Sequence, residues 1–169
     1  MKNTQTNYFL LSKDLTSILL NKCYKPYRTE TKDILLSALA LSFNKVFGLN
    51  SISLYIEGHG REQIVKDIDI TRTIGWFTSI YPVVLNVNNC ENIIDELIKV
   101  KELLHRIPQK GIGFGILKYL SGKAYLFNPT ILFNYLGEFE KQINLPDGDE
   151  LFELLEENYG NPVAPNSKR

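Results

Sequence analysis

The sequence predicts a layered α/β fold in which helices flank a mixed β-sheet. Short apolar segments that alternate every second residue, as strands do, are interspersed with longer segments whose apolar residues recur at helical spacing. Such alternation of strands and helices favours a sheet covered by helices. With 169 residues, 44% of them hydrophobic, and no internal repeat, the chain is long enough for one domain with a substantial core.

The N-terminal part predicts a strand followed by two helices. Residues 8–11 are expected to form a short strand, and Ser12 is a suitable N-cap for a helix that Lys25-Pro26 ends. Residues 31–47 predict a second helix, which Gly48 terminates. Because apolar residues extend almost all round this second helix, we expect it to be buried centrally.

The next predicted strand ends in a carboxylate, Glu57, just before a turn. In residues 51–57 the isoleucines and leucine alternate with serines and tyrosine, so Glu57 falls on the polar side of the strand and should be accessible. Gly58 and Gly60 follow it, and we expect them to permit a tight turn and to leave space for a substrate.

A long polar connection then leads to a second strand. Residues 58–73 are rich in charged side chains, and ion pairs are expected to order them. Residues 76–87 have strong β-propensity, but Pro82 removes a backbone donor in the middle. This segment is therefore predicted to be an edge strand or a bent strand.

The second half predicts two helices, one strand and a tail. A helix capped by Asn88 or Asn89 should run to about Arg106 and bury a stripe formed by Ile93, Ile94, Leu97, Ile98 and Leu104. A short helix near 114–121 and a strand over 131–137 should follow, and residues 141–169 should be loosely held. The glycine pattern at 111–115 follows a helix and a proline, so a nucleotide-binding loop is not predicted.

Composition excludes several classes of function. The 19 basic and 19 acidic residues balance, which gives no electrostatic basis for binding nucleic acid or an anionic membrane. Two histidines and two cysteines, Cys23 and Cys90, argue against a metal site or a disulfide framework, and buried free thiols are expected. The polar N-terminal residues precede no long apolar segment, so we expect a cytoplasmic protein.

Four uncommon motifs occur along the chain in a fixed order. They are Glu-Gly-His-Gly-Arg-Glu at 57–62, Gly-Trp-Phe-Thr-Ser-Ile-Tyr-Pro at 75–82, Pro-Gln-Lys-Gly-Ile-Gly-Phe-Gly at 108–115 and Phe-Asn-Tyr-Leu-Gly at 133–137. Together they resemble the epimerization domains of nonribosomal peptide synthetases, a branch of the condensation-domain superfamily with the chloramphenicol-acetyltransferase-like fold. Amide-forming condensation domains usually lack the first motif, so the resemblance favours epimerization.

The resemblance also shows what this chain does not contain. The family places a His-His-x-x-x-Asp-Gly motif on an N-terminal lobe, whereas only His59 and His105 occur here and neither precedes Asp-Gly. Residues 1–169 are therefore similar to part of a C-terminal lobe, with the family's last strand and helix lying beyond Arg169. The resemblance implies that the chain needs such an N-terminal lobe as a partner and is inactive without it.

The resemblance implies roles for four residues. Inverting an α-carbon requires two groups that remove and return a proton on opposite faces. Glu57 would be one of them, and the histidine of the missing lobe the other. Arg61 would order the turn after Glu57, and Asn134 and Tyr135 would line the site near the thioester. Two further motif residues are expected to support the site: His59 in a structural or orienting role, and Trp76 in the core or at the channel wall.

The substrate would be an aminoacyl or peptidyl thioester on the phosphopantetheine of a peptidyl carrier protein, with no cofactor bound directly. Its product would serve peptide antibiotic biosynthesis.

Simpler interpretations of the same residues remain open. Glu57 could be a solvated carboxylate, and Arg61 could form an ion pair with Asp67 or Asp69. Trp76 could pack in the core, Asn134 could bond its own backbone, and Tyr135 could be an ordinary buried tyrosine. At the level of function, the alternatives are an inactive fragment, a module that docks carrier proteins, and an amide-forming condensation relative.

Overall fold

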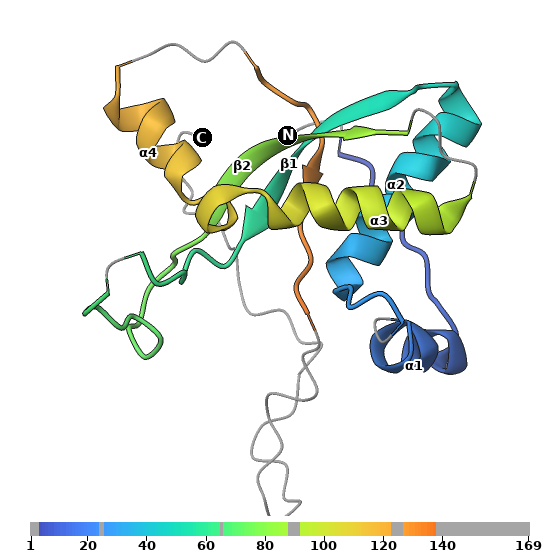
Figure 1. Ribbon diagram of the computed structural model, residues 1–169, viewed down its shortest axis with the longest axis horizontal. Coiled ribbons are helices and arrows are strands. Elements are labelled where there is room, and N and C mark those ends of the chain that lie inside the picture. Colours follow the sequence, from blue (N-terminus) through green and yellow to red (C-terminus); the bar gives the residue numbers. More distant parts are fainter. Residues whose placement is uncertain (1–3, 24–25, 65, 88–91, 123–126, 138–169) are drawn as a thin grey trace, which may run out of the picture. The chain divides into compact units, whose positions relative to one another are not determined.

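The computed structural model describes residues 4–23, 26–64, 66–87, 92–122 and 127–137 (Figure 1). In chain order the elements are α1 (Lys13–Asn21), α2 (Thr31–Phe47), β1 (Ser51–Gly58), β2 (Ser79–Asn86), α3 (Ile93–His105), the 3-10 turn η1 (Pro108–Gly111), α4 (Gly113–Leu120) and β3 (Leu132–Phe133). Residues 1–135 form one unit, and the second unit, 136–169, has only Leu136 and Gly137 described.

The described sheet is mixed, as predicted. Its strand order is β2-β1-β3, with β1 antiparallel to β2 and parallel to β3. Pro82 lies on β2, opposite Tyr55 of β1. Because β2 is at an edge of this sheet, Pro82 can lack an N–H without leaving a neighbouring strand unpaired. The prediction of an edge strand is confirmed, although the strand begins at Ser79 and not at residue 76.

One face of the sheet carries the core. The alternating residues of β1 stand opposite those of β2, as Ile52 does to Leu85 and Leu54 to Val83. They pack with Leu36 of α2 and with α3, which crosses the strands in Figure 1. The remaining buried apolar residues of this cluster are Ala40, Ile56, Tyr81, Val87, Val100 and Leu104. The fold is therefore an α/β layer, and the period-two prediction for β1 is confirmed.

The caps of the first two helices follow their sequence signals. Ser12 Oγ accepts a hydrogen bond from Leu15 N at 3.3 Å, and Gly48 ends α2 in the left-handed conformation with φ 66°. The prediction that α2 is buried almost all round is wrong. Its buried residues form one stripe, whereas Val46 and Phe47 are exposed, because only one side of α2 meets the sheet and α3.

Three further predictions are wrong: one strand, the length of another strand and the N-cap of a helix. Residues 8–11 form no strand, since they have no partner among the described strands to accept their backbone hydrogen bonds. The strand predicted over 131–137 is confined to Leu132–Phe133 for the same reason, as only two of its residues pair with β1. The N-cap of α3 is Asn92, whose Oδ1 accepts from Ile94 N and Asp95 N.

The stripe predicted for α3 is correct only in part. Leu104 is buried and Leu97 is half-buried, as expected, whereas Ile93, Ile94 and Ile98 are exposed. The other buried side chains of this helix are Glu96 and Val100, so the face that meets the core is turned away from the three isoleucines.

Two further expectations concern the cysteines and the tail. Cys23 is a partly buried free thiol, while Cys90 and residues 141–169 lie outside the described residues. Among the helices described, none is both long and apolar enough to cross a bilayer.

Candidate functional site

Glu57 is held at the end of the central strand of the described sheet. It follows Ile56, which is buried in the core, so the alternation of β1 turns the Glu57 side chain toward the other face. Glu57 is half-buried and stands opposite Ile80 of β2. Its carboxylate makes no hydrogen bond or ion pair with any other described residue. A carboxylate held this way on a strand, without an internal partner, is available for proton transfer.

The end of β3 lies beside Glu57. Tyr55 and Ile56 pair with Leu132 and Phe133 in parallel register, so Asn134 follows at the level of Glu57. Phe133 packs against the core, and the next residue therefore points to the opposite face, the one that carries Glu57. The structure thus brings Glu57 and Asn134 together. Tyr135 is half-buried one residue further on.

The turn after Glu57 is tight because Gly60 fits against another segment. Gly60 has φ +65°, and a Cβ added there would lie 1.4 Å from the carbonyl oxygen of Phe77. The prediction that this glycine leaves room for a substrate is wrong, since the Phe77 backbone fills that room. Gly60 instead lets the connection close onto itself.

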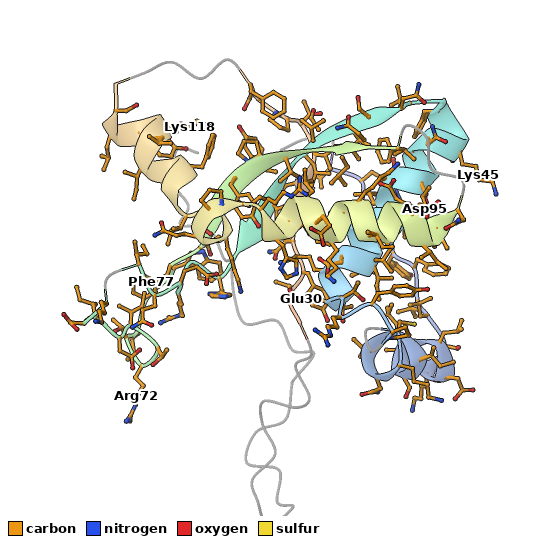
Figure 2. All side chains as sticks on the ribbon, viewed as in Figure 1. Glu30, Lys45, Arg72, Phe77, Asp95 and Lys118 are labelled. Atoms are coloured by element: carbon orange, nitrogen blue, oxygen red, sulfur yellow. The ribbon has the colours of Figure 1, made fainter. Side chains whose placement is uncertain are left out.

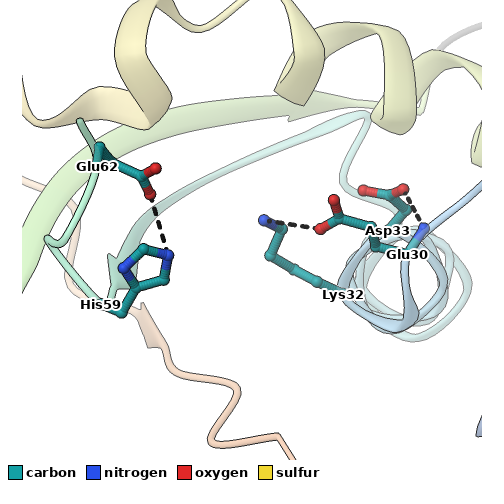
Figure 3. A network of polar contacts seen from close by, with 5 residues as sticks. All are labelled: Glu30, Lys32, Asp33, His59 and Glu62. Atoms are coloured by element: carbon teal, nitrogen blue, oxygen red, sulfur yellow. Dashed lines mark hydrogen bonds and ion pairs between the residues drawn. The ribbon is translucent and has the colours of Figure 1, made fainter. Parts of the chain in front are cut away.

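His59 and Glu62 complete this turn. His59 Nδ1 accepts a hydrogen bond from Arg61 N at 3.0 Å, and its Nε2 lies 3.2 Å from Glu62 Oε1, the contact drawn in Figure 3. Both ring nitrogens are therefore occupied within the turn. These contacts support an orienting function for His59 rather than a direct chemical one.

Arg61 organises the connection between β1 and β2. Its guanidinium donates to the carbonyls of Ile70 at 2.7 Å, Thr73 at 2.9 Å and Gly75 at 3.1 Å. It also lies over the Phe77 ring, with Cζ 4.5 Å from the centroid. The alternative in which Arg61 pairs with Asp67 or Asp69 is wrong for the described residues, since carbonyl oxygens occupy the guanidinium. Asp69 instead accepts from Thr71 N, a hydrogen bond that lowers the pKa of Asp69.

The connection ordered by Arg61 presents apolar side chains to solvent. Trp76 is 90% exposed and Ile74 is fully exposed, so a core position for Trp76 is wrong. Arg61 binds the backbone carbonyls of Thr73 and Gly75, on either side of Ile74. The backbone therefore faces Arg61, and the side chains of Ile74 and Trp76 project outward. Trp76 is not among the residues that line the pocket of about 590 Å³ described below, whereas its neighbour Phe77 is.

Tyr81 belongs to the core. Burial raises the pKa of its hydroxyl, and the nearby charges of Glu62 and Glu30 add to this effect. Gly111 packs directly on its ring, since a Cβ on Gly111 would lie 2.1 Å from the ring carbon Cγ.

A buried carboxylate lies on the core side of the molecule, at the start of α2. Asp33 is 2% exposed, and its Oδ2 accepts a hydrogen bond from Glu30 N at 2.8 Å (Figure 3). Burial raises the pKa of Asp33, while Lys32 and His105 oppose that rise. The sequence reasoning missed this residue, although Glu30 and Asp33 have the spacing of a capping box.

The face that carries Glu57 also contains a pocket of about 590 Å³. Tyr55 and Ile80 contribute to its wall from the sheet, Phe77 from the connection, and Phe114 and Lys118 from α4. Glu57 does not itself line this pocket, but two of its neighbours do: Tyr55, two residues earlier on β1, and Ile80, its partner on β2. The sequence reasoning missed Lys118, although the i,i+4 spacing of Phe114 and Lys118 places both on one side of a short helix.

No group of three or more potential metal ligands occurs within the described ranges. The site is therefore built from a carboxylate, an amide and an apolar pocket. The core lies on one face of the mixed sheet, and Glu57 and the pocket lie on the other.

Comparison with known proteins identifies the family. Residues 2–158 match the family described as Condensation domain. A plipastatin synthase of Bacillus subtilis (strain 168) is 44% identical over 176 aligned positions, which cover 99% of this chain and 7% of that protein. Gramicidin S synthase 1 of Brevibacillus brevis is 39% identical and covers 99% of this chain and 16% of that protein. The chain belongs to the condensation-domain family, and it spans a small part of these synthetases.

Two solved structures are similar to this one. The epimerization domain from the third module of tyrocidine synthetase B superposes with a TM-score of 0.73 at 43% identity, covering 78% of this chain and 30% of that one. The first condensation domain of the CDA synthetase superposes with a TM-score of 0.52 at 16% identity, covering 70% of this chain and 26% of that one. The second match shows the shared fold alone.

Proposed function

We propose that this chain supplies one wall of an epimerization site in a nonribosomal peptide synthetase. The reaction inverts the α-carbon of a carrier-bound aminoacyl or peptidyl thioester from L to D. A lobe bearing His-His-x-x-x-Asp-Gly completes the site, and the work takes place in the cytoplasm, in the assembly of a peptide antibiotic.

One observation carries the proposal: Glu57 lies near the end of its strand, on the face away from the core and level with Asn134, and its carboxylate has no partner among the described residues. A thioester acidifies its α-hydrogen, because the carbanion left by deprotonation is delocalised as an enolate. Glu57 and the histidine of the completing lobe act on opposite faces of that carbon, one removing the proton and the other returning one. Asn134 donates its amide N–H toward the developing oxyanion, which lowers the barrier.

The substrate's attachment follows from the same proposal. Phosphopantetheine on a peptidyl carrier protein holds the thioester, and the chain binds no cofactor of its own. Arg61 supports the site indirectly, by ordering the connection that leads from Glu57 to its strand partner Ile80. His59 orients the same turn.

Reconstitution tests this function. The chain is combined with the N-terminal lobe of the tyrocidine synthetase B epimerization domain, to which it is 43% identical. A carrier loaded with an L-aminoacyl thioester is added in D2O, and chiral chromatography with mass spectrometry measures D-isomer and α-deuterium. We expect D-isomer carrying solvent deuterium, and a loss of at least about 100-fold in rate for Glu57→Gln.

The matched control is Asp67→Asn, the same acid-to-amide change on an exposed carboxylate of the same connection. It should leave the rate unchanged. A full rate in Glu57→Gln would remove Glu57 from the mechanism. A new amide product would instead identify a condensation activity, and carrier binding without deuterium incorporation would identify a docking module.

A further inference from the structure

Lys118 occupies an unusual place beside the Glu57 face. It lies on α4 (Figure 2) and extends toward the sheet, where its Nζ is 5.6 Å from the centroid of the Tyr55 ring. The rings of Phe114 and Tyr119 lie 5.8 and 5.5 Å from the same nitrogen. Three aromatic rings at these distances hold an ammonium by cation–π attraction.

This ammonium has no anionic partner in the part of the chain that the structure describes. Neither of the two described ion pairs involves Lys118. Aromatic rings stabilise a cation without neutralising it, so the positive charge remains available to a bound ligand. Most surface lysines are surrounded by water, whereas this one is partly buried at an apolar pocket.

The pocket has the size and lining of a small-molecule site. Its volume of about 590 Å³ is within the usual range for such sites, roughly 300–1,000 Å³. Apolar groups from Tyr55, Ile80, Phe114 and Leu132 form most of the wall, and the hydroxyls of Thr78 and Thr130 offer a few polar contacts. A fitting ligand has a slender, largely apolar arm and one negative charge.

We propose that this pocket binds such an arm and that Lys118 binds its anion. The inference rests on the proposed function, which supplies two sources for that chemistry. One is the phosphate of the phosphopantetheine arm, and the other is a carboxylate on the side chain of the residue being epimerized. In either case Lys118 positions the ligand in the pocket and takes no part in proton transfer.

Binding to the purified chain tests the inference without requiring catalysis. The probes are pantetheine, 4′-phosphopantetheine, and the glutamyl and leucyl thioesters of pantetheine, each titrated by NMR. Either 4′-phosphopantetheine or the glutamyl thioester should bind at least about tenfold more tightly than its uncharged counterpart. Lys118→Met should abolish this gain and Lys118→Arg should retain it, while Lys45→Met, on an exposed lysine of α2, should have no effect.

A pair of glycines tests the pocket itself. Gly113 and Gly115 both lie in α4, and a Cβ on either would meet no atom within 4 Å, but only Gly115 lines the pocket. Gly115→Leu should block binding of every probe, and Gly113→Leu should preserve it.

The probe whose affinity depends on Lys118 identifies the anion: 4′-phosphopantetheine indicates the phosphate, and the glutamyl thioester indicates a side-chain carboxylate. Equal binding of charged and uncharged probes, or a gain that survives in Lys118→Met, would overturn the inference. Glu57→Gln should bind all probes normally, which separates this inference from the proposed function. Reconstituted epimerization without probe binding would refute the pocket assignment alone, whereas Lys118-dependent binding without epimerization would refute only the function.

Discussion

The two faces of the described sheet are made by the same strands but differ in burial. On one face Ile52, Leu54 and Ile56 are covered by helices and almost completely buried. On the other face Tyr55 and Glu57 are partly accessible, beside a pocket. A single step along β1 therefore separates a residue that stabilises the fold from one that is available for chemistry. Because side chains alternate between the two faces, a substitution on the accessible face can change the site without disturbing the core.

Substitution of Leu54 should have the largest effect on stability. Leu54 is 0% exposed, and Leu54→Ala removes buried methyl groups and leaves a cavity, so we expect a loss of about 3–5 kcal/mol in the free energy of unfolding. Urea denaturation followed by circular dichroism measures it. Glu57→Gln, on the opposite face, should stay within about 0.5 kcal/mol of wild type. Comparable losses in both variants would show that Glu57 is a structural residue.

Arg61 should have the next largest effect, confined to one segment. Arg61→Met removes three hydrogen bonds to carbonyls and the contact with the Phe77 ring, and we expect a local loss of roughly 1.5–3 kcal/mol. Faster amide hydrogen exchange across residues 59–78, with the core strands unchanged, would be the signature.

Arg72→Met is the control for this prediction. Arg72 projects from the tip of the same connection (Figure 2) and makes no hydrogen bond or ion pair with the described residues. Its loss should leave hydrogen exchange unchanged. If both variants loosen the connection equally, net charge and not the geometry of Arg61 orders it.

The faces also differ in how much of them the sequence could predict. The alternation in β1 correctly placed Ile52, Leu54 and Ile56 inside and Glu57 outside, because burial of one face imposes a period of two. The helix caps at Ser12 and Gly48 could also be predicted from the sequence, since a cap depends on neighbouring residues alone. Residues 8–11 were mistaken for a strand because strand pairing depends on a distant partner that local pattern does not reveal.

The site was harder to predict than the core, because it depends more on contacts between residues that are distant in the sequence. Glu57 and Asn134 come together through the parallel pairing of β1 with β3, which no local pattern specifies, and family resemblance alone named them together. The sequence left open whether Arg61 orders the turn or pairs with Asp67 or Asp69, and the fold placed backbone carbonyls around it. Lys118 was missed because its significance comes from a tyrosine on a strand more than sixty positions earlier in the chain.

Asp33 offers a smaller, pH-dependent test on the core side. Burial raises its folded-state pKa above 3.8, so the folded protein holds the proton more tightly than the unfolded chain does. This contribution to stability is fully present below 3.8 and is lost as the pH rises through the folded-state value. Asp33→Asn cannot titrate, and the stability of wild type relative to this variant should therefore fall with rising pH over that interval.

Thermal unfolding of both proteins across the acidic range measures that difference. Both proteins contain the neighbours Glu30, Lys32 and His105, so the comparison isolates the contribution of the Asp33 carboxyl and of its interactions with them. A difference that rises with pH would mean that hydrogen bonding to Glu30 N outweighs burial at Asp33.

The smallest effect is expected in α4, which adjoins the open face of the sheet. Gly115 lies inside this helix, and a Cβ there would meet nothing within 4 Å, so Gly115→Ala should stabilise the protein by about 0.5–1 kcal/mol through helix propensity. Gly111, four residues earlier, provides the contrast, because its Cβ would strike the buried ring of Tyr81 and its φ is +82°. Gly111→Ala should be destabilising, and the two melting temperatures should therefore move in opposite directions. A loss of stability in Gly115→Ala would show that the space beside α4 is filled and that the pocket is closed.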